Sequence, residues 1–205
     1  GFFTLPNPPL AAELHEGQPI SALAVADLDG DRLPEVLQVS AGMFQVFWNL
    51  GDLSFSRVDM QYIEEREESL SYLTLSLGDL DQDGDLDLVL PAFGTADAGE
   101  LDIEGGAPDK VLMLENNRYL PAVDLVVSGD GSRTMVSTFT DQDLDGDLDL
   151  FIPGDRGPAS AFWRHDGVND QGKPMFTNNA RELGADIVMS AMGIDSADLN
   201  GDGRL

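Results

Sequence analysis

The sequence predicts an all-β protein, specifically a β-propeller of four-stranded blades, of which this chain supplies about three and a half as a partial ring. Three observations support this fold class. A short acidic motif occurs four times in the 205 residues, with first positions 52, 62 and 57 residues apart. Short apolar segments flank each copy, and helical periodicity is scarce. Each repeat is long enough for four strands, which is the size of one propeller blade.

The acidic motif has one design in all four copies. Counting from the first residue of each copy, positions 1, 3 and 5 carry oxygen-bearing side chains, and the three complete copies have an acid at position 9. Position 6 is glycine in three copies and Arg32 in the first. The copies occupy residues 27–35, 79–87, 141–149 and 198–205, and they are called the first to fourth loops.

The spacing of these acids is typical of a calcium site. Ca²⁺ takes six to eight oxygen ligands at about 2.3–2.6 Å, from carboxylates, backbone carbonyls and water. A tight loop directs side chains 1, 3 and 5 toward one point, and glycine at position 6 permits the sharp turn. The carbonyl of position 7 and the acid of position 9 then complete the shell. Because Mg²⁺ favours a smaller, water-rich octahedron, the sequence predicts structural Ca²⁺ in about three to four sites.

An EF-hand is the main alternative metal-binding motif, and the sequence argues against it. An EF-hand needs a bidentate Glu at position 12, between two helices. In the complete copies, position 12 holds Gln38, Leu90 and Ile152. The residues that follow the loops are β-branched and apolar, which favours strands over helices.

A solvated turn is the other alternative for an Asp-rich loop, because Asp and Gly are common turn residues. Four copies in one register argue against this alternative. Without a cation, three to five carboxylates within one loop would also repel one another strongly.

Each loop is expected to lie between two strands and to be followed by two more. The first strand precedes the loop, at residues 21–26, 73–78, 134–140 and 191–197. The second strand is at 35–39, 87–90 and 149–152, and the third is at 44–48, 111–114 and 161–163. The last strand opens near Phe55, Leu120 and Phe176. Trp48 and Trp163 fall at one register of the third strand, so packing residues are expected there.

The predicted domain organisation is an extended N-terminal arm, 1–17, followed by the blades. The blades span about 18–70, 71–130, 131–188 and, incomplete, 189–205. In the second blade an insertion, 94–109, is rich in Gly and acid and is expected to be a loop, while the charged segment 63–70 is expected to connect blades. Because the fourth loop ends before its position-9 acid, the chain is expected to be part of a longer protein. An oligomer that completes the ring is the alternative.

The repeats resemble FG-GAP/VCBS-type repeats. Residues 78–88 and 191–205 carry the resemblance in the loops, and 47–55 resembles the hairpin with Asn, Gly and Phe that follows such loops. The fourth copy is most similar to the cartilage-acidic-protein and UnbV-like group. The resemblance covers about residues 20–205, although the namesake Phe-Gly-Gly-Ala-Pro is not intact. It implies a calcium-bearing propeller like those of integrin α-subunits and of large bacterial secreted proteins.

The resemblance also implies the metal ligands. In the first loop they are Asp27, Asp29, Asp31 and Glu35; in the second, Asp79, Asp81, Asp83 and Asp87; in the third, Asp141, Asp143, Asp145 and Asp149; in the fourth, Asp198, Asn200 and Asp202. Asp85 and Asp147 would contribute backbone carbonyls, with their side chains pointing outward.

The composition excludes several classes of function. The chain has 38 acidic and 11 basic residues and a formal net charge of −27. This charge argues against nucleic acid as a partner and against docking on anionic membranes. No apolar run approaches the ~18–20 residues of a membrane-spanning helix. With no cysteine, the chain has no disulfide, thiol catalysis or zinc–thiolate site.

The expected function is an extracellular, calcium-stabilised module for binding, adhesion or scaffolding. The protein is expected to be secreted or on the cell surface, with the periplasm as an alternative location. Its expected partners are a protein or glycan at the loop surface, or copies of itself or other subunits in an assembly. No catalytic constellation or phosphate loop is evident, so an enzyme is not expected. His165, in a predicted turn, is expected to be solvated. Two alternatives stay open, namely part of a secreted polysaccharide-acting enzyme and a subunit of a surface filament or sheath.

Overall fold

The computed structural model describes residues 20–40, 43–52, 54–57, 61–62, 70–97, 100–101, 107–126 and 133–201. The predicted arm 1–17, the charged segment up to residue 69 and the predicted ligand Asp202 lie outside these residues. The described part is built of strands with one short helix, α1 (Ala180–Leu183). Within it, no helix has the length and apolar character needed to cross a membrane.

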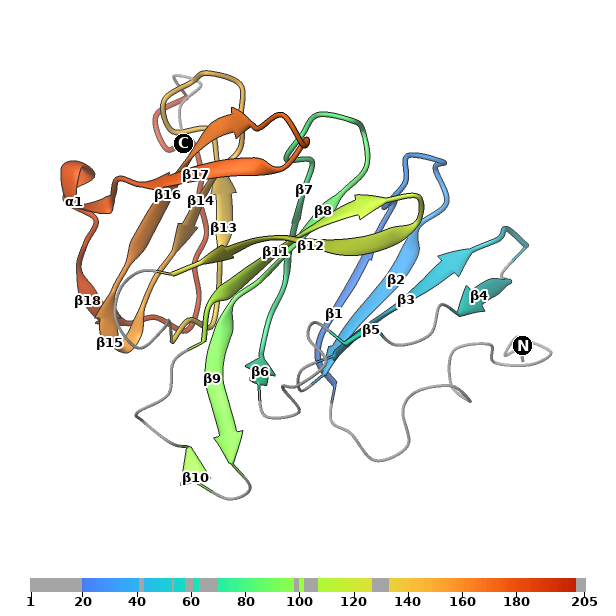
Figure 1. The fold of residues 1–205 in the computed structure, drawn as a ribbon, viewed down its shortest axis with the longest axis horizontal. Helices are drawn as coiled ribbons and strands as arrows, with labels where there is room; N and C mark the ends of the chain where they lie inside the picture. Colours follow the sequence, from blue (N-terminus) through green and yellow to red (C-terminus); the bar gives the residue numbers. More distant parts are fainter. Residues whose placement is uncertain are drawn as a thin grey trace.

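Three antiparallel sheets stand side by side, and each takes its four principal strands in chain order (Figure 1). The first sheet contains β1 (Ile20–Ala26), β2 (Glu35–Ser40), β3 (Met43–Asn49) and β4 (Phe55–Arg57), with β5 (Gln61–Tyr62) also paired to β3. The second contains β7 (Ser76–Gly78), β8 (Asp87–Leu90), β11 (Asp109–Glu115) and β12 (Arg118–Leu125). The third contains β13 (Thr138–Thr140), β14 (Asp149–Ile152), β16 (Ala161–Val168) and β17 (Pro174–Asn178).

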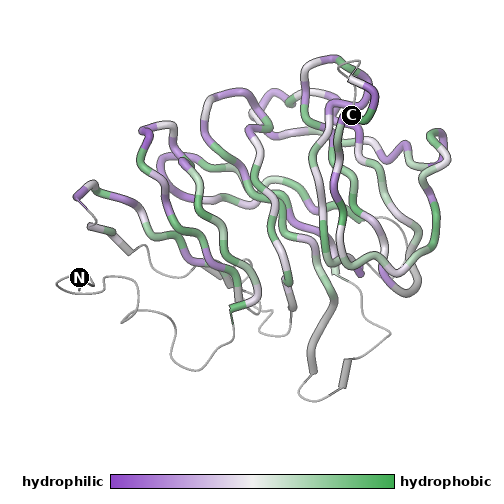
Figure 2. The backbone as a smooth tube through the Cα atoms, turned by 180° about the vertical axis from the view of Figure 1, so that it is seen from behind, coloured by the Kyte–Doolittle hydropathy of each residue, from purple (hydrophilic) through white to green (hydrophobic). Residues whose placement is uncertain are grey.

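Two hydrophobic cores lie between these sheets. The first core joins residues of the first and second sheets, including Leu37, Val39 and Leu88. The second core joins the second and third sheets, including Val89 and Leu150. Because side chains alternate along a strand, the second sheet has one face in each core, while the first and third sheets each contribute one face to one core. Figure 2 shows hydrophobic residues along the strands and hydrophilic residues at the loops.

A leucine at position 2 ties each of the first two loops to the neighbouring repeat. Leu28 of the first loop is 1% exposed and lies in the first core, against which Leu86 of the second loop packs. Leu80 of the second loop is 2% exposed and lies in the second core, against which Leu148 of the third loop packs. The loops are therefore anchored in the cores and do not simply project into solvent.

The strand register corrects the expected alignment of the two tryptophans. The residue after the position-9 acid is Val36, Leu88 or Leu150, and its partners on the third strand are Phe47, Leu112 and Trp163. Trp163 therefore corresponds to Phe47, one residue before Trp48. Since a shift of one residue reverses the face, Trp48 packs in the first core and Trp163 in the second.

The insertion in the second repeat contains strands where the sequence suggested a loop. β9 (Ala92–Asp97) pairs with β6 (Leu70–Tyr72) and with β10 (Glu100–Leu101). The Thr134 amide also donates to the Ala92 carbonyl at 2.9 Å. These pairings give the backbone of this acidic, Gly-containing segment the hydrogen bonds that a strand needs.

The first strand of the fourth copy does not form where it was predicted. Residues 191–197 have no regular structure, and the strand before them, β18 (Val188–Ser190), pairs instead with β15 (Asp155–Ala159) of the third repeat. Gly193 and Asp195 are poor strand formers, and the edge of β15 offers pairing partners a few residues earlier in the sequence.

Candidate metal centre

The first three acidic loops each connect the first two strands of one sheet. They lie at the same end of the three sheets, at the top of Figure 1. This placement follows from the repeat, because each sheet has the same strand order and direction. The structure therefore brings acidic residues from three distant parts of the sequence to one end of the molecule.

All three loops have the same backbone conformation. Position 6 has a left-handed φ whichever residue occupies it, and the values are 73° for Arg32, 97° for Gly84 and 97° for Gly146. Position 4 is also left-handed, which the sequence analysis missed, and here the values are 73° for Gly30, 61° for Gln82, 64° for Leu144 and 75° for Gly201. The recurrence of glycine at position 4 in two of the four loops was the available signal.

The side chains at position 1 hold the turn by accepting backbone hydrogen bonds. In each loop the amide of position 6 donates to this carboxylate, at 2.9 Å from Arg32 to Asp27, 3.1 Å from Gly84 to Asp79 and 3.1 Å from Gly146 to Asp141. The amide of position 7 donates in turn to position 5, at 2.7 Å from Leu33 to Asp31, 2.9 Å from Asp85 to Asp83 and 2.9 Å from Asp147 to Asp145. Aspartate at positions 1 and 5 thus shapes the loop, which then presents the remaining carboxylate lone pairs.

The acid at position 9 clamps the loop to the third strand. Asp87 accepts the amide of Leu80 at 2.8 Å and the amide of Leu114 at 2.9 Å. In the same way Asp149 accepts from Gln142 at 2.9 Å and His165 at 2.8 Å, and Glu35 accepts from Leu28 at 2.8 Å and Asn49 at 3.4 Å. All three acids are buried, with 0–1% of their surface exposed. Position 9 therefore connects the start of each loop to the sheet.

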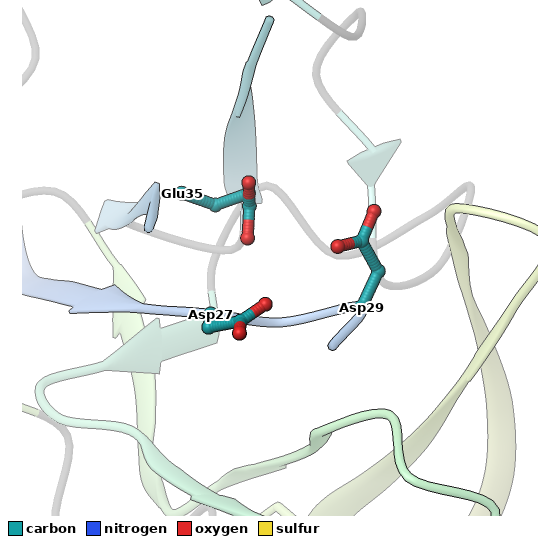
Figure 3. A group of neighbouring side chains, drawn as sticks. All are labelled: Asp27, Asp29 and Glu35. Atoms are coloured by element: carbon teal, nitrogen blue, oxygen red, sulfur yellow. The ribbon is translucent and has the colours of Figure 1, made fainter. Parts of the chain in front are cut away.

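Three groups of carboxylates are placed to hold a metal ion. Within each group, one oxygen of every residue lies within 4.8 Å of one oxygen of each other residue. The groups are Asp27, Asp29 and Glu35; Asp79, Asp81 and Asp87; and Asp141, Asp143 and Asp145. Figure 3 shows the first group, with the three side chains turned toward a common space.

The electrostatics of these groups favour a bound cation. Burial raises the pKa of Asp87 to about 7, although hydrogen bonds from Leu114 and Leu80 oppose the rise, and repulsion from Asp81 and Asp83 adds to it. The pKa of Asp81 is also raised, first by burial and then by the charge of Asp83. A cation between these oxygens would offset both burial and repulsion.

The pKa values of the other two position-9 acids move in the same direction. Burial raises the pKa of Glu35, with further repulsion from Asp29 and Asp31. Burial also raises the pKa of Asp149, with repulsion from Asp143 and Asp145. The position-9 carboxylate of each loop is thus destabilised in its charged form by its surroundings.

The oxygen atoms of the first group fit a hard cation. Asp27 Oδ1 is buried and has no hydrogen-bond partner. A buried carboxylate oxygen that accepts nothing is costly, and a metal ion is one of the few groups that satisfies it. Carboxylate and carbonyl donors suit Mg²⁺, Ca²⁺ or Mn²⁺ rather than metals that prefer nitrogen or sulfur.

The remaining predicted ligands lie around these groups. Asp31, Asp83, Asp85, Asp147 and Asp149 belong to the same three loops but fall outside the 4.8 Å groups among the described residues. In the fourth loop, Asp198 Oδ1 accepts the amides of Asn200 at 3.2 Å and Gly201 at 2.7 Å. These amides belong to positions 3 and 4, whereas in the first three loops the amide of position 6 donates to position 1. The described part of the fourth loop shares the left-handed position 4, at Gly201.

His165 differs from its expected place in a solvated turn. It lies in β16 and is 2% exposed, because β16 continues to Val168 and pairs with β17. Its ring packs on Phe176, with centroids 5.0 Å apart. Its Nδ1 lies 3.7 Å from Oδ2 of Asp147, a residue of the third loop that the sequence analysis expected to point outward.

Comparison with known families finds a match over part of the chain. The sequence profile of the FG-GAP-like repeat matches residues 27–90, from the first position of the first loop to the end of β8. The match includes the first two carboxylate groups, which come from positions 1, 3 and 9. The group of the third loop, from positions 1, 3 and 5, lies outside the match. No curated protein shows significant sequence similarity to the chain.

Proposed function

We propose that this chain is part of a calcium-stabilised β-propeller that acts as an extracellular binding, adhesion or scaffold module. One observation carries the proposal. Three loops of the same conformation each bring three carboxylates together at the same end of three packed sheets. In this proposal each sheet is a blade, and the FG-GAP-like match at residues 27–90 supports that assignment.

Ca²⁺ is the proposed ion because of the donor set. The proposed ligands in each loop are the side chains of positions 1, 3, 5 and 9 and the carbonyl of position 7. This set gives at least five oxygens with several charges, and Ca²⁺ accepts six to eight in flexible geometry, whereas Mg²⁺ requires a near-ideal octahedron. When bound, the ion supplies positive charge that offsets carboxylate burial and repulsion.

The proposed role of the site is structural. Position 9 holds the start of its loop and the third strand at once, for example through the Leu80 and Leu114 amides on Asp87. Fixing this carboxylate therefore fixes the loop relative to the sheet. The position-2 leucines carry the same constraint into the cores between sheets.

An extracellular location and a partner at the loop surface complete the proposal. Calcium sites of extracellular modules bind at about 10⁻⁴–10⁻³ M, a range that intracellular calcium does not reach. A set of loops at one end of packed sheets is also the usual place for a binding surface, since loops carry function on a rigid scaffold. A protein or glycan is the proposed ligand, and copies of the chain or other subunits are the alternative partners.

The proposal is tested by thermal and urea unfolding of the whole chain with EDTA and with excess Ca²⁺. At a free calcium concentration 100 times Kd, each filled site adds about 2.7 kcal/mol to the free energy of unfolding. The substitution Asp87→Asn is expected to remove about that much of the calcium-dependent gain, because it removes one ligand charge in the second loop. Asp170→Asn, an exposed aspartate between β16 and β17, serves as a matched control and should keep the full gain.

Equal stability in EDTA and in calcium would contradict the proposal. If Mg²⁺ or Mn²⁺ raised the free energy of unfolding as much as Ca²⁺ does, the loops would still be metal sites, but the assignment of the ion as Ca²⁺ would be wrong. Isothermal titration with each chloride salt distinguishes these outcomes and gives the number of sites.

A further inference from the structure

Gln82 is a side chain of the second loop that reaches the third. It occupies position 4, has φ of 61° and is exposed. Its Nε2 donates to Oδ1 of Asp147 at 2.7 Å and lies 3.4 Å from the carbonyl oxygen of Gly146. The side chain therefore extends from its own loop to the turn of the neighbouring one.

The residues that Gln82 contacts form the turn of the third loop. Gly146 is position 6, where φ is 97°, and Asp147 is position 7, whose carbonyl is a proposed ligand. The other carboxylate oxygen of Asp147 lies 3.7 Å from Nδ1 of buried His165. Asp147 therefore lies between Gln82 of the second loop, which is hydrogen-bonded to it, and His165 of strand β16, which is near it.

Within the second loop, the backbone around Gln82 is fixed by the proposed ligands. Asp79 accepts the amides of Asp83 and Gly84, each at 3.1 Å, and Asp81 accepts the amide of Asp83 at 3.3 Å. Ordering these carboxylates orders residues 81–84 and, with them, the direction of the Gln82 side chain. The order of one loop thus reaches the turn of the next through the contacts of Gln82 with the Asp147 side chain and the Gly146 carbonyl.

We propose that Gln82 couples the second and third metal sites, so that filling one raises the affinity of the other. The proposal rests on the proposed function, because it requires both loops to bind a metal. Coupling between two sites is reciprocal and is typically about 5- to 150-fold. Because this contact is exposed, we expect a change in affinity at the lower end of this range, about fivefold.

The junction between the first and second loops provides an internal comparison. Position 4 of the first loop is Gly30, which has no side chain to extend, and a Cβ there would meet the Gly84 carbonyl oxygen at 3.5 Å. These two loops are joined through the backbone instead, by the Leu86 amide on the Leu28 carbonyl at 2.8 Å. Loss of the Gln82 side chain should therefore leave the first junction intact.

The test uses Gln82→Gly in the full chain. Glycine occupies position 4 in the first and fourth loops, so the backbone accepts it and the turn keeps its shape. Gln171→Ala is the matched control, because Gln171 is an exposed glutamine between β16 and β17, outside all four loops. The calcium affinity of the third loop is measured from the NMR signal of the Asp147 amide. The substitution Asp87→Asn is used to prevent calcium binding at the second loop.

Relative to the wild-type chain, Asp87→Asn alone should weaken calcium binding at the third loop about fivefold. Gln82→Gly should weaken it by a similar factor, and the double variant should show no further loss. Gln171→Ala should leave the affinity unchanged. Without calcium, hydrogen exchange at the Gly146 and Asp147 amides should be faster in Gln82→Gly than in the control.

Two results would overturn the coupling, and they are distinguishable. If the Asp147 signal responds to calcium but its midpoint is the same in wild type, Gln82→Gly and Asp87→Asn, the sites are independent, while the proposed function stands. If no signal in any loop responds to calcium, the proposed function fails and the coupling fails with it. Unchanged hydrogen exchange in Gln82→Gly would contradict the role of the side chain in holding the third loop.

Discussion

At the scale of single residues, Arg32 stands where the other loops have glycine. Its φ of 73° is in the left-handed region, where Gly84 and Gly146 lie in the second and third loops. An L-residue pays about 1–2 kcal/mol for this conformation, because its Cβ approaches the following carbonyl oxygen. The first loop therefore keeps the common shape in spite of its sequence, which shows that the hydrogen bonds of the loop outweigh the local preference of one residue.

Replacement of Arg32 by glycine is expected to stabilise the protein. The relief of about 1–2 kcal/mol is reduced by the greater freedom of glycine in the unfolded chain, which costs about 0.4–1 kcal/mol. The net gain therefore lies between about 0 and 1.6 kcal/mol, centred near 0.8 kcal/mol. Urea unfolding in EDTA measures it. Arg32→Ala removes the same charge but keeps the left-handed strain, so a gain as large with alanine as with glycine would show that charge, not backbone conformation, is responsible.

At the scale of strands and loops, β7 approaches the third sheet closely at Gly78. A Cβ at Gly78 would lie 2.9 Å from Phe139 Cε2 and 3.1 Å from Leu148 Cδ1. Nearby, the Thr74 hydroxyl donates to the Met135 carbonyl at 2.6 Å, and the Ser76 hydroxyl donates to the Ser137 carbonyl at 2.9 Å. The first strands of neighbouring repeats are thus joined by both packing and hydrogen bonds.

The substitution Gly78→Ala is expected to lower the free energy of unfolding by about 1–3 kcal/mol, since the new methyl group overpacks the contact with Phe139. Chemical denaturation provides the measurement. Gly193→Ala is the matched control, because nothing lies within 4 Å of a Cβ there, and it should change stability by less than about 0.5 kcal/mol. Equal effects of the two substitutions would contradict the proposed tightness of this junction.

The same scale shows how far the sequence predicts the structure. β8 and β14 form where expected, because a position-9 acid marks the start of each and continuous apolar residues follow. The strand predicted at 191–197 does not form, since pairing with β15 selects residues 188–190 instead, a tertiary effect that local pattern does not contain. The first three loops could be located from spacing alone, but the contact of Gln82 with the third loop could not, because it depends on how two repeats pack.

At the scale of the whole molecule, the net charge of −27 and the repeated architecture determine how stability is distributed. The three acidic loops gather at one end, so their mutual repulsion adds to the repulsion within each loop. The two cores lie between successive sheets, as in a linear array in which each repeat contacts its neighbours. Stability is therefore a sum of sheet terms and interface terms, opposed by charge at the loop end.

Salt is expected to substitute partly for calcium. Raising NaCl from about 0.1 to 1 M shortens the Debye length from about 10 to 3 Å, which screens repulsion between loops. In EDTA we expect a gain of about 1 kcal/mol, or about 2–4 °C in Tm for a chain of this length. In saturating calcium the gain should be smaller, because bound ions already offset the carboxylates. Differential scanning calorimetry measures both, and an equal shift in the two conditions would contradict this account of the charge.

The placement of the two tryptophans has a practical consequence. They are the chain's only two, and one is buried in each core, Trp48 between the first and second sheets and Trp163 between the second and third. Each indole therefore emits from a different interface, and a variant with either tryptophan replaced by phenylalanine is a fluorescent reporter of the other. Whether the two interfaces open together or one after the other can be read from the emission of these two variants, without attaching any dye.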